Sequence, residues 1–287
     1  MAIIDCDFNL RTKYHYLIHL LMGLVMTTVP LPALGQLIVA HRGASYSAPE
    51  NTLAAFELAW QEDADAIEGD FRLTRDGHIV CIHDKNTSRT SNVDCEVAAS
   101  NLSELQTLDV GSWKHKRYAD QRIPTLEKVL EMVPAGKKIF IELKAGPEIV
   151  APLQKVLESS PLDREQMVVI SFDKATVREV KKSLPEIKAH WLTGYDADGE
   201  SESDSYERIS QTLRWCQADG LGSKAERNCF DEGLVRQLEG SGLKEFHVWT
   251  VDDPQDAKYY AALGAYGITT NRPAYIRKHL GTPPQKK

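Results

Sequence analysis

The sequence lacks an excess of basic charge, a cysteine motif and any linker between domains. Its formal net charge is −7, and it has no stripe of lysine and arginine that could neutralise the phosphates of a nucleic acid. None of its five cysteines stands in a C-x-x-C pair, which argues against a cysteine-ligated zinc site or a dithiol redox centre. No internal repeat or Gly/Ser-rich linker divides residues 37–280. These absences exclude nucleic-acid binding and favour a single folded domain.

Only one long apolar run is present, and it lies near the N-terminus. Arg11 and Lys13 precede an apolar stretch over 16–29, and a Pro-Leu-Pro-Ala-Leu-Gly segment ends at Gly35. This order is typical of a secretory signal peptide, so we expect residues 1–35 to be cleaved on export to the periplasm or the cell exterior. A membrane anchor is the alternative, although the run is shorter than the roughly 20 residues that a membrane-spanning helix needs.

Residues 36–287 then form the expected folded domain. They contain four cysteines: Cys81, Cys95, Cys216 and Cys229. An exported protein could join these cysteines in any of three pairings, and buried free thiols are the alternative.

Short apolar runs of β type alternate with amphipathic helical patterns along this domain. The predicted strands are Leu37–Ala40, Ala66–Asp70, Lys138–Lys144, Met167–Phe172, Ile187–Leu192, Ala218–Leu221, Glu245–Val251 and Gly267–Thr270. The predicted helices are Asn51–Gln61, Pro124–Met132, Glu148–Glu158, Lys174–Ser183, Glu207–Cys216, Glu232–Glu239, Gln255–Leu263 and Ala274–His279. Near-continuous apolar strands between helices are typical of parallel strands buried on both faces. Eight strand–helix units over about 250 residues predict an α/β fold, a (β/α)8 TIM barrel, with an open doubly wound sheet as the alternative.

One further apolar run breaks the alternation. Ile79–His83 follows the second strand too closely for a helix to lie between them, and Asp76-Gly77 is a strong signal for a two-residue hairpin turn. With such a turn, Asp70 lies opposite His83. The segment from about 71 to 123 is therefore predicted to be an insertion, a hairpin and cap over the mouth of the barrel.

Ionisable side chains stand at the carboxyl ends of the predicted strands, where this barrel type gathers its functional residues. Residues two apart in a strand share a face, so neighbouring carboxylates point the same way. The residues at these ends are His41, Arg42, Glu68, Asp70, His83, Glu142, Lys144 and Trp249.

The three carboxylates of Glu68, Asp70 and Glu142 predict a metal site. Converging in one barrel mouth, they would repel one another unless a cation neutralised them. An all-oxygen set suits Mg²⁺ or Ca²⁺. The structural alternative needs no metal: Glu142 would pair with Lys144, and Glu68 or Asp70 would pair with Arg42 or Arg72.

The remaining residues fit proton transfer and phosphate binding. His41 and His83 have ordinary pKa values that let one accept and the other donate a proton near neutrality. The planar guanidinium group of Arg42 can bind two phosphate oxygens at once, and the ammonium group of Lys144 can bind phosphate as a point charge. Trp249 is read either as an apolar wall for the substrate or as core packing. Together these residues predict metal-assisted cleavage of a phosphate ester.

With these motifs, the sequence resembles the glycerophosphodiester phosphodiesterase family over essentially all of 38–280. The matching motifs are His41-Arg42-Gly43, Pro49-Glu50-Asn51-Thr52, Ala64-Asp65-Ala66-Ile67-Glu68-Gly69-Asp70, Thr74-Arg75-Asp76-Gly77, His83-Asp84, Ile123-Pro124-Thr125-Leu126-Glu127, Ile141-Glu142-Leu143-Lys144, Trp249-Thr250-Val251 and Gly267-Ile268-Thr269-Thr270-Asn271-Arg272-Pro273. This sequence departs from the family at Asn271, where the family commonly has Asp. The interactions at the carboxyl end of the last strand therefore do not follow from the resemblance.

The resemblance implies a (β/α)8 barrel with an insertion after the second strand. It implies hydrolysis of glycerophosphodiesters to an alcohol and sn-glycerol 3-phosphate with a divalent cation. The family's catalytic histidines fall on His41 and His83, and its phosphate contacts fall on Arg42 and Lys144. Its metal carboxylates fall on Glu68, Asp70 and Glu142.

Two other functions are compatible with the same barrel. An enzyme for lysophospholipids or sphingolipids would need an apolar entrance, which Trp113 and Tyr118 of the insertion could supply among Lys114, Lys116 and Arg117. A non-catalytic phosphate-binding barrel would be expected to have lost a histidine or a carboxylate, and this sequence keeps all five. Membrane contact is compatible with the main prediction but is not required by it, and the sequence leaves the leaving alcohol and the oligomeric state open.

Overall fold

The structure is a computed structural model that describes residues 36–195 and 202–281. The predicted signal peptide or anchor at 1–35 lies outside these residues. Within the described ranges, no helix is both long enough and apolar enough to cross a membrane.

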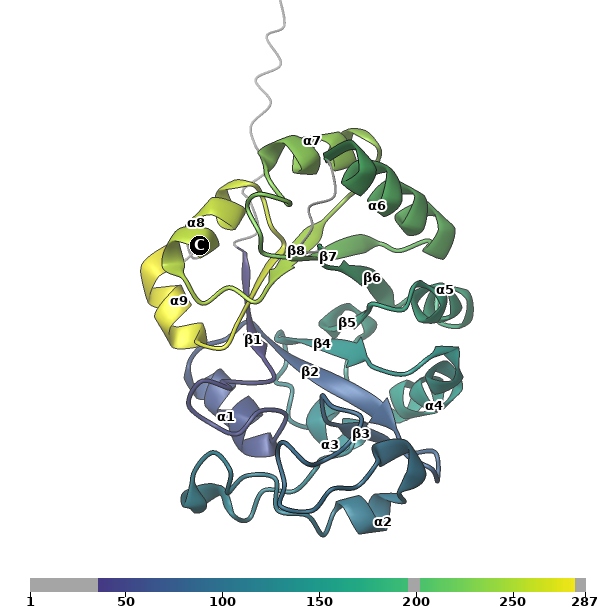
Figure 1. Ribbon diagram of the computed structural model, residues 1–287, viewed down its shortest axis with the longest axis vertical. Coiled ribbons are helices and arrows are strands. Elements are labelled where there is room, and N and C mark those ends of the chain that lie inside the picture. Colours follow the sequence, from purple (N-terminus) through teal and green to yellow (C-terminus); the bar gives the residue numbers. More distant parts are fainter. Residues whose placement is uncertain (1–35, 196–201, 282–287) are drawn as a thin grey trace, which may run out of the picture. The chain divides into compact units, whose positions relative to one another are not determined.

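Eight parallel strands close a barrel, and each is paired with two other strands of the barrel. Figure 1 shows most of these strands side by side. In order around the barrel they are β1 (Leu37–His41), β2 (Ala66–Leu73), β4 (Lys138–Leu143), β5 (Met167–Ser171), β6 (Lys188–Thr193), β7 (Gly220–Lys224), β8 (Phe246–Trp249) and β9 (Gly267–Thr270). β9 pairs with β1, which closes the ring. The predicted (β/α)8 barrel is confirmed, and the open-sheet alternative is wrong.

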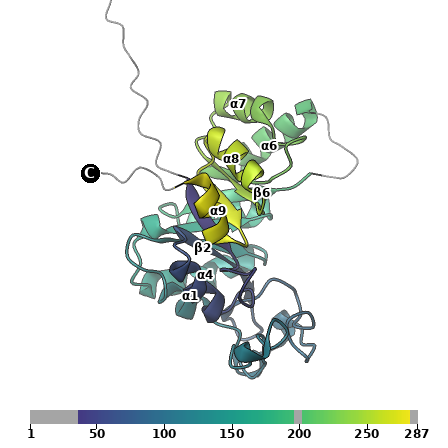
Figure 2. The same cartoon turned by 90° about the vertical axis from the view of Figure 1, so that its left-hand side faces the viewer.

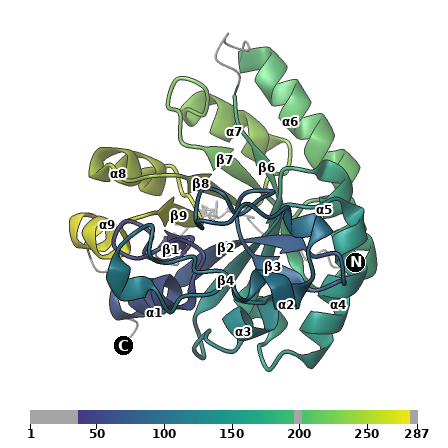
Figure 3. The same ribbon diagram turned by 60° about the horizontal axis from the view of Figure 1, so that its bottom comes forward.

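Helices lie outside the strands and surround them (Figure 3). They are α1 (Leu53–Gln61), α3 (Leu126–Leu130), α4 (Val150–Ser159), α5 (Lys174–Ser183), α6 (Glu202–Cys216), α7 (Glu232–Gly240), α8 (Pro254–Ala262) and α9 (Pro273–Leu280). α5 shows why such sequences form helices here: the Asp173 side chain accepts a hydrogen bond from the N–H of Ala175, and Val177 and Val180 are buried. The main apolar core therefore lies between the strands and this outer layer.

A second, smaller core fills the barrel interior. Its buried members include Val39, Phe140, Val168 and Leu192. This core lies beneath the carboxyl ends of the strands and supports the side chains there.

Two histidines interrupt the apolar interior. His190 and His247 are fully buried, and their Nδ1 atoms lie 3.1 Å apart. Nε2 of His190 lies 2.7 Å from a carboxylate oxygen of Glu245, the residue just before β8. Glycines make room for the two rings, because a Cβ at Gly222 would lie 2.5 Å from Nε2 of His247, and one at Gly220 would lie 2.7 Å from Nε2 of His190. A hydrogen-bonded row thus replaces apolar packing along one side of the barrel.

The chain between β2 and α3 forms a hairpin strand, β3 (Ile79–Cys81), and a largely irregular segment with a short helix, α2 (Leu102–Leu105). β3 runs antiparallel to β2. The irregular segment lies at one end of the molecule beyond β3 (Figures 1 and 2). It contacts the loop after β1, because Nζ of Lys114 donates a hydrogen bond to the carbonyl of Ser45.

The predicted register of the hairpin is wrong by one residue. Phe71 pairs with Cys81, which places Asp70 opposite Ile82 instead of His83. The turn is longer than two residues, because Oγ1 of Thr74 donates to Asp76 and accepts from the N–H of His78. These side-chain bonds stabilise a wider loop than the Asp-Gly pair alone would form.

The cysteines form no disulfide in the described part of the chain. Cys81, Cys95, Cys216 and Cys229 are all thiols that belong to no disulfide, and Cys81 and Cys216 are buried. The structure therefore agrees with the expectation of thiols that form no disulfide and not with a disulfide pairing of these cysteines.

Candidate active site

The carboxyl ends of the strands surround a cavity of about 170 Å³. Seven of the eight residues expected at the site line it: His41, Arg42, Glu68, His83, Glu142, Lys144 and Trp249. The eighth, Asp70, is fully buried beside Arg42 and Lys144. The structure therefore brings together all the residues that the sequence singled out.

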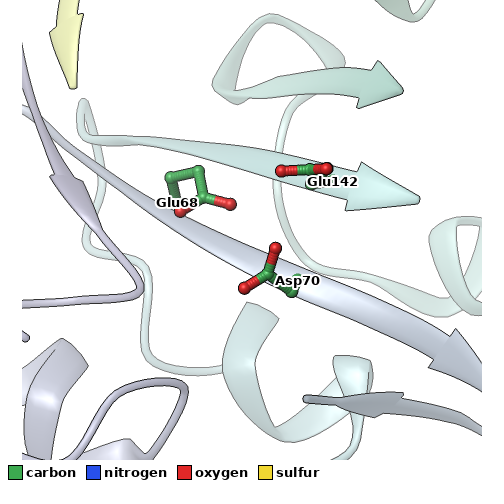
Figure 4. A group of neighbouring side chains, drawn as sticks. All are labelled: Glu68, Asp70 and Glu142. Carbon is green, nitrogen blue, oxygen red and sulfur yellow. The ribbon is translucent and has the colours of Figure 1, made fainter. Parts of the chain in front are cut away.

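Glu68, Asp70 and Glu142 form a compact group of buried carboxylates (Figure 4). Glu68 and Asp70 are two apart on β2, and Asp70 pairs with Glu142 on the adjacent strand β4. One oxygen from each lies within 4.8 Å of the others. Parallel pairing of two strands thus fixes the spacing of the group.

The group is electrostatically strained without a cation. Burial raises the pKa of Glu68 well above its ordinary value, and the Asp70 and Glu142 carboxylates raise it further. Burial and the Asp70 carboxylate raise the pKa of Glu142 to about 7. Burial also acts to raise the pKa of Asp70, but the Lys144 and Arg42 charges outweigh it and hold that pKa below its ordinary value. One carboxylate is therefore firmly ionised, and its two neighbours resist ionisation.

Oxygen atoms of the group are available to a cation. Oε1 of Glu68 is buried and has no hydrogen-bond partner among the described residues. Oδ1 of Asp70 and Oε1 of Glu142 contact the same ammonium group, that of Lys144, at 3.1 and 2.6 Å. Three buried carboxylate oxygens facing one space fit a hard divalent ion such as Mg²⁺ or Ca²⁺.

Arg42 borders the same space from the end of β1. Its Nε lies 3.1 Å from Asp70, and its Nη1 lies 2.9 Å from Glu50. Its backbone N–H donates to Oε2 of Glu68 at 2.9 Å, with the residue in the left-handed conformation. Arg42 and Lys144 thus stand on either side of Asp70, each close enough to bind an anion placed near the carboxylates.

The two histidines each use Nδ1 to contact a neighbouring side chain. Nδ1 of His41 lies 2.7 Å from Oδ1 of Asn271, and Nδ1 of His83 lies 2.7 Å from Oδ1 of Asp84. Burial and the adjacent Arg42 charge lower the pKa of His41 to about 4. Burial also lowers the pKa of His83, with the Asp84 carboxylate acting in the opposite direction. His41 is backed by a neutral amide, and His83 by an anion.

Sequence reasoning missed the residues that hold this group in place. Thr52 caps α1, and Asn51 before it donates from Nδ2 to Asp70 and accepts the Asp70 N–H. The Glu50 carboxylate forms ion pairs with both Arg42 and Arg89, and Arg89 also forms an ion pair with Asp84. Only the position of these residues in or beside the strand-end motifs could have indicated such a role.

One wall of the cavity is apolar. The rings of Trp249 and Phe172 pack edge to face with centroids 5.3 Å apart. Ile170 and Leu192 continue this wall. The cavity therefore has a charged side formed by β1, β2 and β4, and an apolar side formed by β5, β6 and β8.

The sequence and fold match known proteins over most of the chain. Residues 41–275 match the glycerophosphoryl diester phosphodiesterase family. A glycerophosphodiester phosphodiesterase of Caldanaerobacter subterraneus subsp. tengcongensis is 36% identical over 244 residues, which are 83% of this chain and 94% of that protein. One of Bacillus altitudinis is 30% identical over 242 residues, 82% of this chain and 94% of that protein.

A solved structure agrees with these matches. A phosphodiesterase of Oleispira antarctica, in complex with the product sn-glycerol-3-phosphate, superposes with a TM-score of 0.76 and 28% identity, covering 86% of this chain and 97% of that one. With its barrel, its strand-end residues and its sequence all in agreement, this chain belongs to the glycerophosphoryl diester phosphodiesterase family.

Proposed function

We propose that this chain hydrolyses glycerophosphodiesters to an alcohol and sn-glycerol 3-phosphate, using a divalent cation and a pair of histidines. The observation that carries the proposal is the cavity lined by two histidines, an arginine, a lysine and the carboxylates of Glu68 and Glu142, with the buried Asp70 carboxylate beside them. The named activity of the relatives and the product bound to the Oleispira protein support the same substrate class.

Glu68, Asp70 and Glu142 would hold the cation, Mg²⁺ or Ca²⁺. When bound, such an ion neutralises the carboxylates and stabilises negative charge on phosphate oxygens. Arg42 and Lys144 would bind the remaining phosphate oxygens, Arg42 through its fork and Lys144 as a point charge. Trp249 would contact the carbon skeleton of the substrate.

The groups behind the histidines suggest a division of roles. His41, with its lowered pKa and neutral partner, is suited to accept a proton at Nε2 from the attacking oxygen. His83, whose Nδ1 faces the Asp84 carboxylate, is better suited to carry a proton and deliver it to the leaving alkoxide. The attacking oxygen belongs either to water or to the neighbouring glycerol hydroxyl, and the second route passes through a cyclic phosphate.

Phosphorus-31 NMR of the purified chain acting on glycerophosphocholine tests this proposal. We expect the diester signal to be replaced by that of sn-glycerol 3-phosphate, and a transient cyclic phosphate would identify the hydroxyl route. Release of phosphocholine would show cleavage of the other ester bond and contradict the proposal. No turnover by folded protein with Mg²⁺ or Ca²⁺ would favour the non-catalytic phosphate-binding barrel.

A second candidate substrate class is lysophospholipids or sphingolipids. Phe172 stands 46% exposed beside Trp249 at the cavity, and Trp113 of the insertion is 42% exposed. An acyl chain could lie on such exposed aromatic surface. Faster turnover of lysophosphatidylcholine than of glycerophosphocholine at equal concentration would favour this class. A Phe172→Ser variant should then slow the turnover of lysophosphatidylcholine and leave the turnover of glycerophosphocholine unchanged.

We also propose that residues 1–35 direct export and that 36–287 form the mature domain. The basic, apolar and small-residue order of the N-terminus supports this. Mass spectrometry of the chain secreted by a bacterial host should give a mature protein that begins at Gln36. Full-length protein retained in the membrane fraction would instead support an anchor.

A further inference from the structure

The ends of β8, β9 and β1 are joined by a row of hydrogen bonds behind His41. These three strands are neighbours in the barrel, in that order. Asp252 follows β8, Asn271 follows β9, and His41 ends β1. Neither Asp252 nor Asn271 lines the cavity, so each can act on the reaction only through another residue.

Asp252 anchors the row. Its Oδ1 accepts hydrogen bonds from Oγ1 of Thr270 and from the backbone N–H of Asn271, both at 2.8 Å. Its Oδ2 accepts from Nδ2 of Asn271 at 2.6 Å. An ionised carboxylate only accepts hydrogen bonds, so the side-chain atom of Asn271 that faces it must be the NH₂ group.

The orientation of Asn271 then dictates the proton on His41. With its NH₂ group directed to Asp252, its Oδ1 faces Nδ1 of His41 at 2.7 Å and also accepts from Oγ of Ser45 at 2.8 Å. An amide oxygen only accepts hydrogen bonds, so Nδ1 of a neutral His41 carries the hydrogen. Nε2 is then the ring nitrogen with a free lone pair, and His41 lines the cavity.

We propose that Asp252 and Asn271 are positioning residues that hold His41 in the Nδ1–H tautomer, so that Nε2 can accept the proton of the nucleophile. This inference rests on the proposed function for its effect on catalysis, but the tautomer itself can be measured without substrate. It also gives a role to Asp252 and Asn271, which lie close to Trp249 and Thr270 in the sequence but do not line the cavity.

An isosteric change at Asp252 inverts the row. In Asp252→Asn, the new amide oxygen must stay where Oδ1 was, because it faces the backbone N–H of Asn271. Its NH₂ group then takes the place of Oδ2 and donates toward Asn271. Asn271 must turn its oxygen to residue 252 and its NH₂ group to His41, which leaves the hydrogen on Nε2.

A double variant restores the row. In Asp252→Asn with Asn271→Asp, the amide at 252 donates to a carboxylate at 271, and that carboxylate accepts from Nδ1 of His41. The acid and the amide have exchanged places, and the tautomer of the wild-type protein returns. A purely structural role for Asp252 predicts no such rescue.

The experiment is nitrogen-15 NMR of the histidine side chains in the purified full chain at pH 7.5, with His41 assigned from a His41→Asn variant. We expect an Nδ1-protonated His41 in the wild type and in the double variant, and an Nε2-protonated His41 in Asp252→Asn. Thermal unfolding of each variant, which we expect to match the wild type, serves as the folding control. An Nε2-protonated His41 in the wild type, or an unchanged tautomer in folded Asp252→Asn, would overturn the inference.

Kinetics with glycerophosphocholine then test the consequence. We expect kcat of Asp252→Asn to fall on the order of 100-fold or more with little change in KM, as expected for a base held in the wrong tautomer, and to recover in the double variant. An inverted tautomer with undiminished kcat would overturn the role assigned to the row. A wild-type enzyme with no activity would refute the proposed function instead, while the NMR result would still decide the tautomer.

Discussion

At the scale of single residues, the two site histidines differ in what stands behind them. Nδ1 of His41 faces the amide of Asn271, whereas Nδ1 of His83 faces the carboxylate of Asp84. The sequence predicted both histidines as a pair, because each stands in a motif at a strand end. It could not predict their partners, because Asn271 reaches His41 only when the barrel closes, and the Asp84 contact depends on the path of the chain after β3.

Replacing either histidine should remove catalysis without unfolding the protein. In His41→Asn and His83→Asn, we expect kcat for glycerophosphocholine to fall at least about 100-fold, because positioned acid or base groups contribute about that much or more. The control is His78→Asn in the exposed hairpin turn, which should keep full activity. Near-normal turnover in either site variant, with folding verified by circular dichroism, would remove that histidine from the mechanism.

The Asp84 carboxylate should set the alkaline limit of the reaction. Its negative charge favours the protonated form of His83, so Asp84→Asn should lower the pKa of His83 further. If His83 is the general acid, the alkaline limb of the kcat profile then moves to lower pH, by about one pH unit. Asp94→Asn removes the same charge from an exposed position in the same segment and should leave the limb unchanged. An unmoved limb in Asp84→Asn would assign the acid to another group.

At the scale of elements, the strands were predictable and the hairpin register was not. Apolar runs of β type identified all eight barrel strands, because parallel strands buried on both faces have no polar alternation. The Asp76-Gly77 pair indicated a two-residue turn, but the bonds of the Thr74 side chain form a longer one. His83 still reaches the cavity because β3 ends at Cys81, so its direction is not set by the strand.

The glycines of β7 should be essential to the interior row of histidines. In Gly222→Ala, the new Cβ would lie 2.5 Å from Nε2 of His247, closer than real contacts allow. We expect the free energy of unfolding to fall by about 1–3 kcal/mol, as for other overpacked interiors. Gly240→Ala at the end of α7 is the control, because a Cβ there meets nothing within 4 Å. Equal stability of the two variants by urea denaturation would show that the interior can relax around the methyl group.

His247 should make the barrel less stable in mild acid. Burial and the neighbouring His190 lower its pKa well below 6.5, so it stays neutral in the folded protein. An unfolded histidine takes up a proton below about pH 6.5. The contribution of His247 to the free energy of unfolding is therefore complete above that pH and falls below it, by about 1.4 kcal/mol per pH unit.

The difference between wild type and His247→Gln isolates this effect. Glu142, with a pKa raised to about 7, acts in the opposite direction, because the folded protein binds its proton more readily than the unfolded chain. We therefore compare the change in unfolding free energy between pH 7.5 and 5.5, in EDTA, for both proteins. The wild type should lose more stability than the variant over this range, and parallel curves would contradict a neutral, buried His247.

At the scale of the whole molecule, the count of eight strand–helix units was enough to predict a closed barrel. A closed parallel barrel brings all the carboxyl ends of its strands to one face, and this explains why residues from 41 to 249 meet in one cavity. The row behind His41 follows from the same closure, since it requires β8, β9 and β1 to be adjacent. The sequence could place residues at strand ends, but the pairing of their side chains depends on barrel geometry.

The most direct test of the account is the rate of sn-glycerol 3-phosphate release from glycerophosphocholine before and after metal removal. We expect EDTA to abolish release, and Mg²⁺ or Ca²⁺ to restore it in the wild type but not in Glu68→Gln. This variant removes the carboxylate whose buried Oε1 has no hydrogen-bond partner among the described residues. Undiminished release by protein shown to be metal-free would contradict a catalytic cation at Glu68, Asp70 and Glu142. No release by the folded wild type with either metal would contradict the proposed reaction itself.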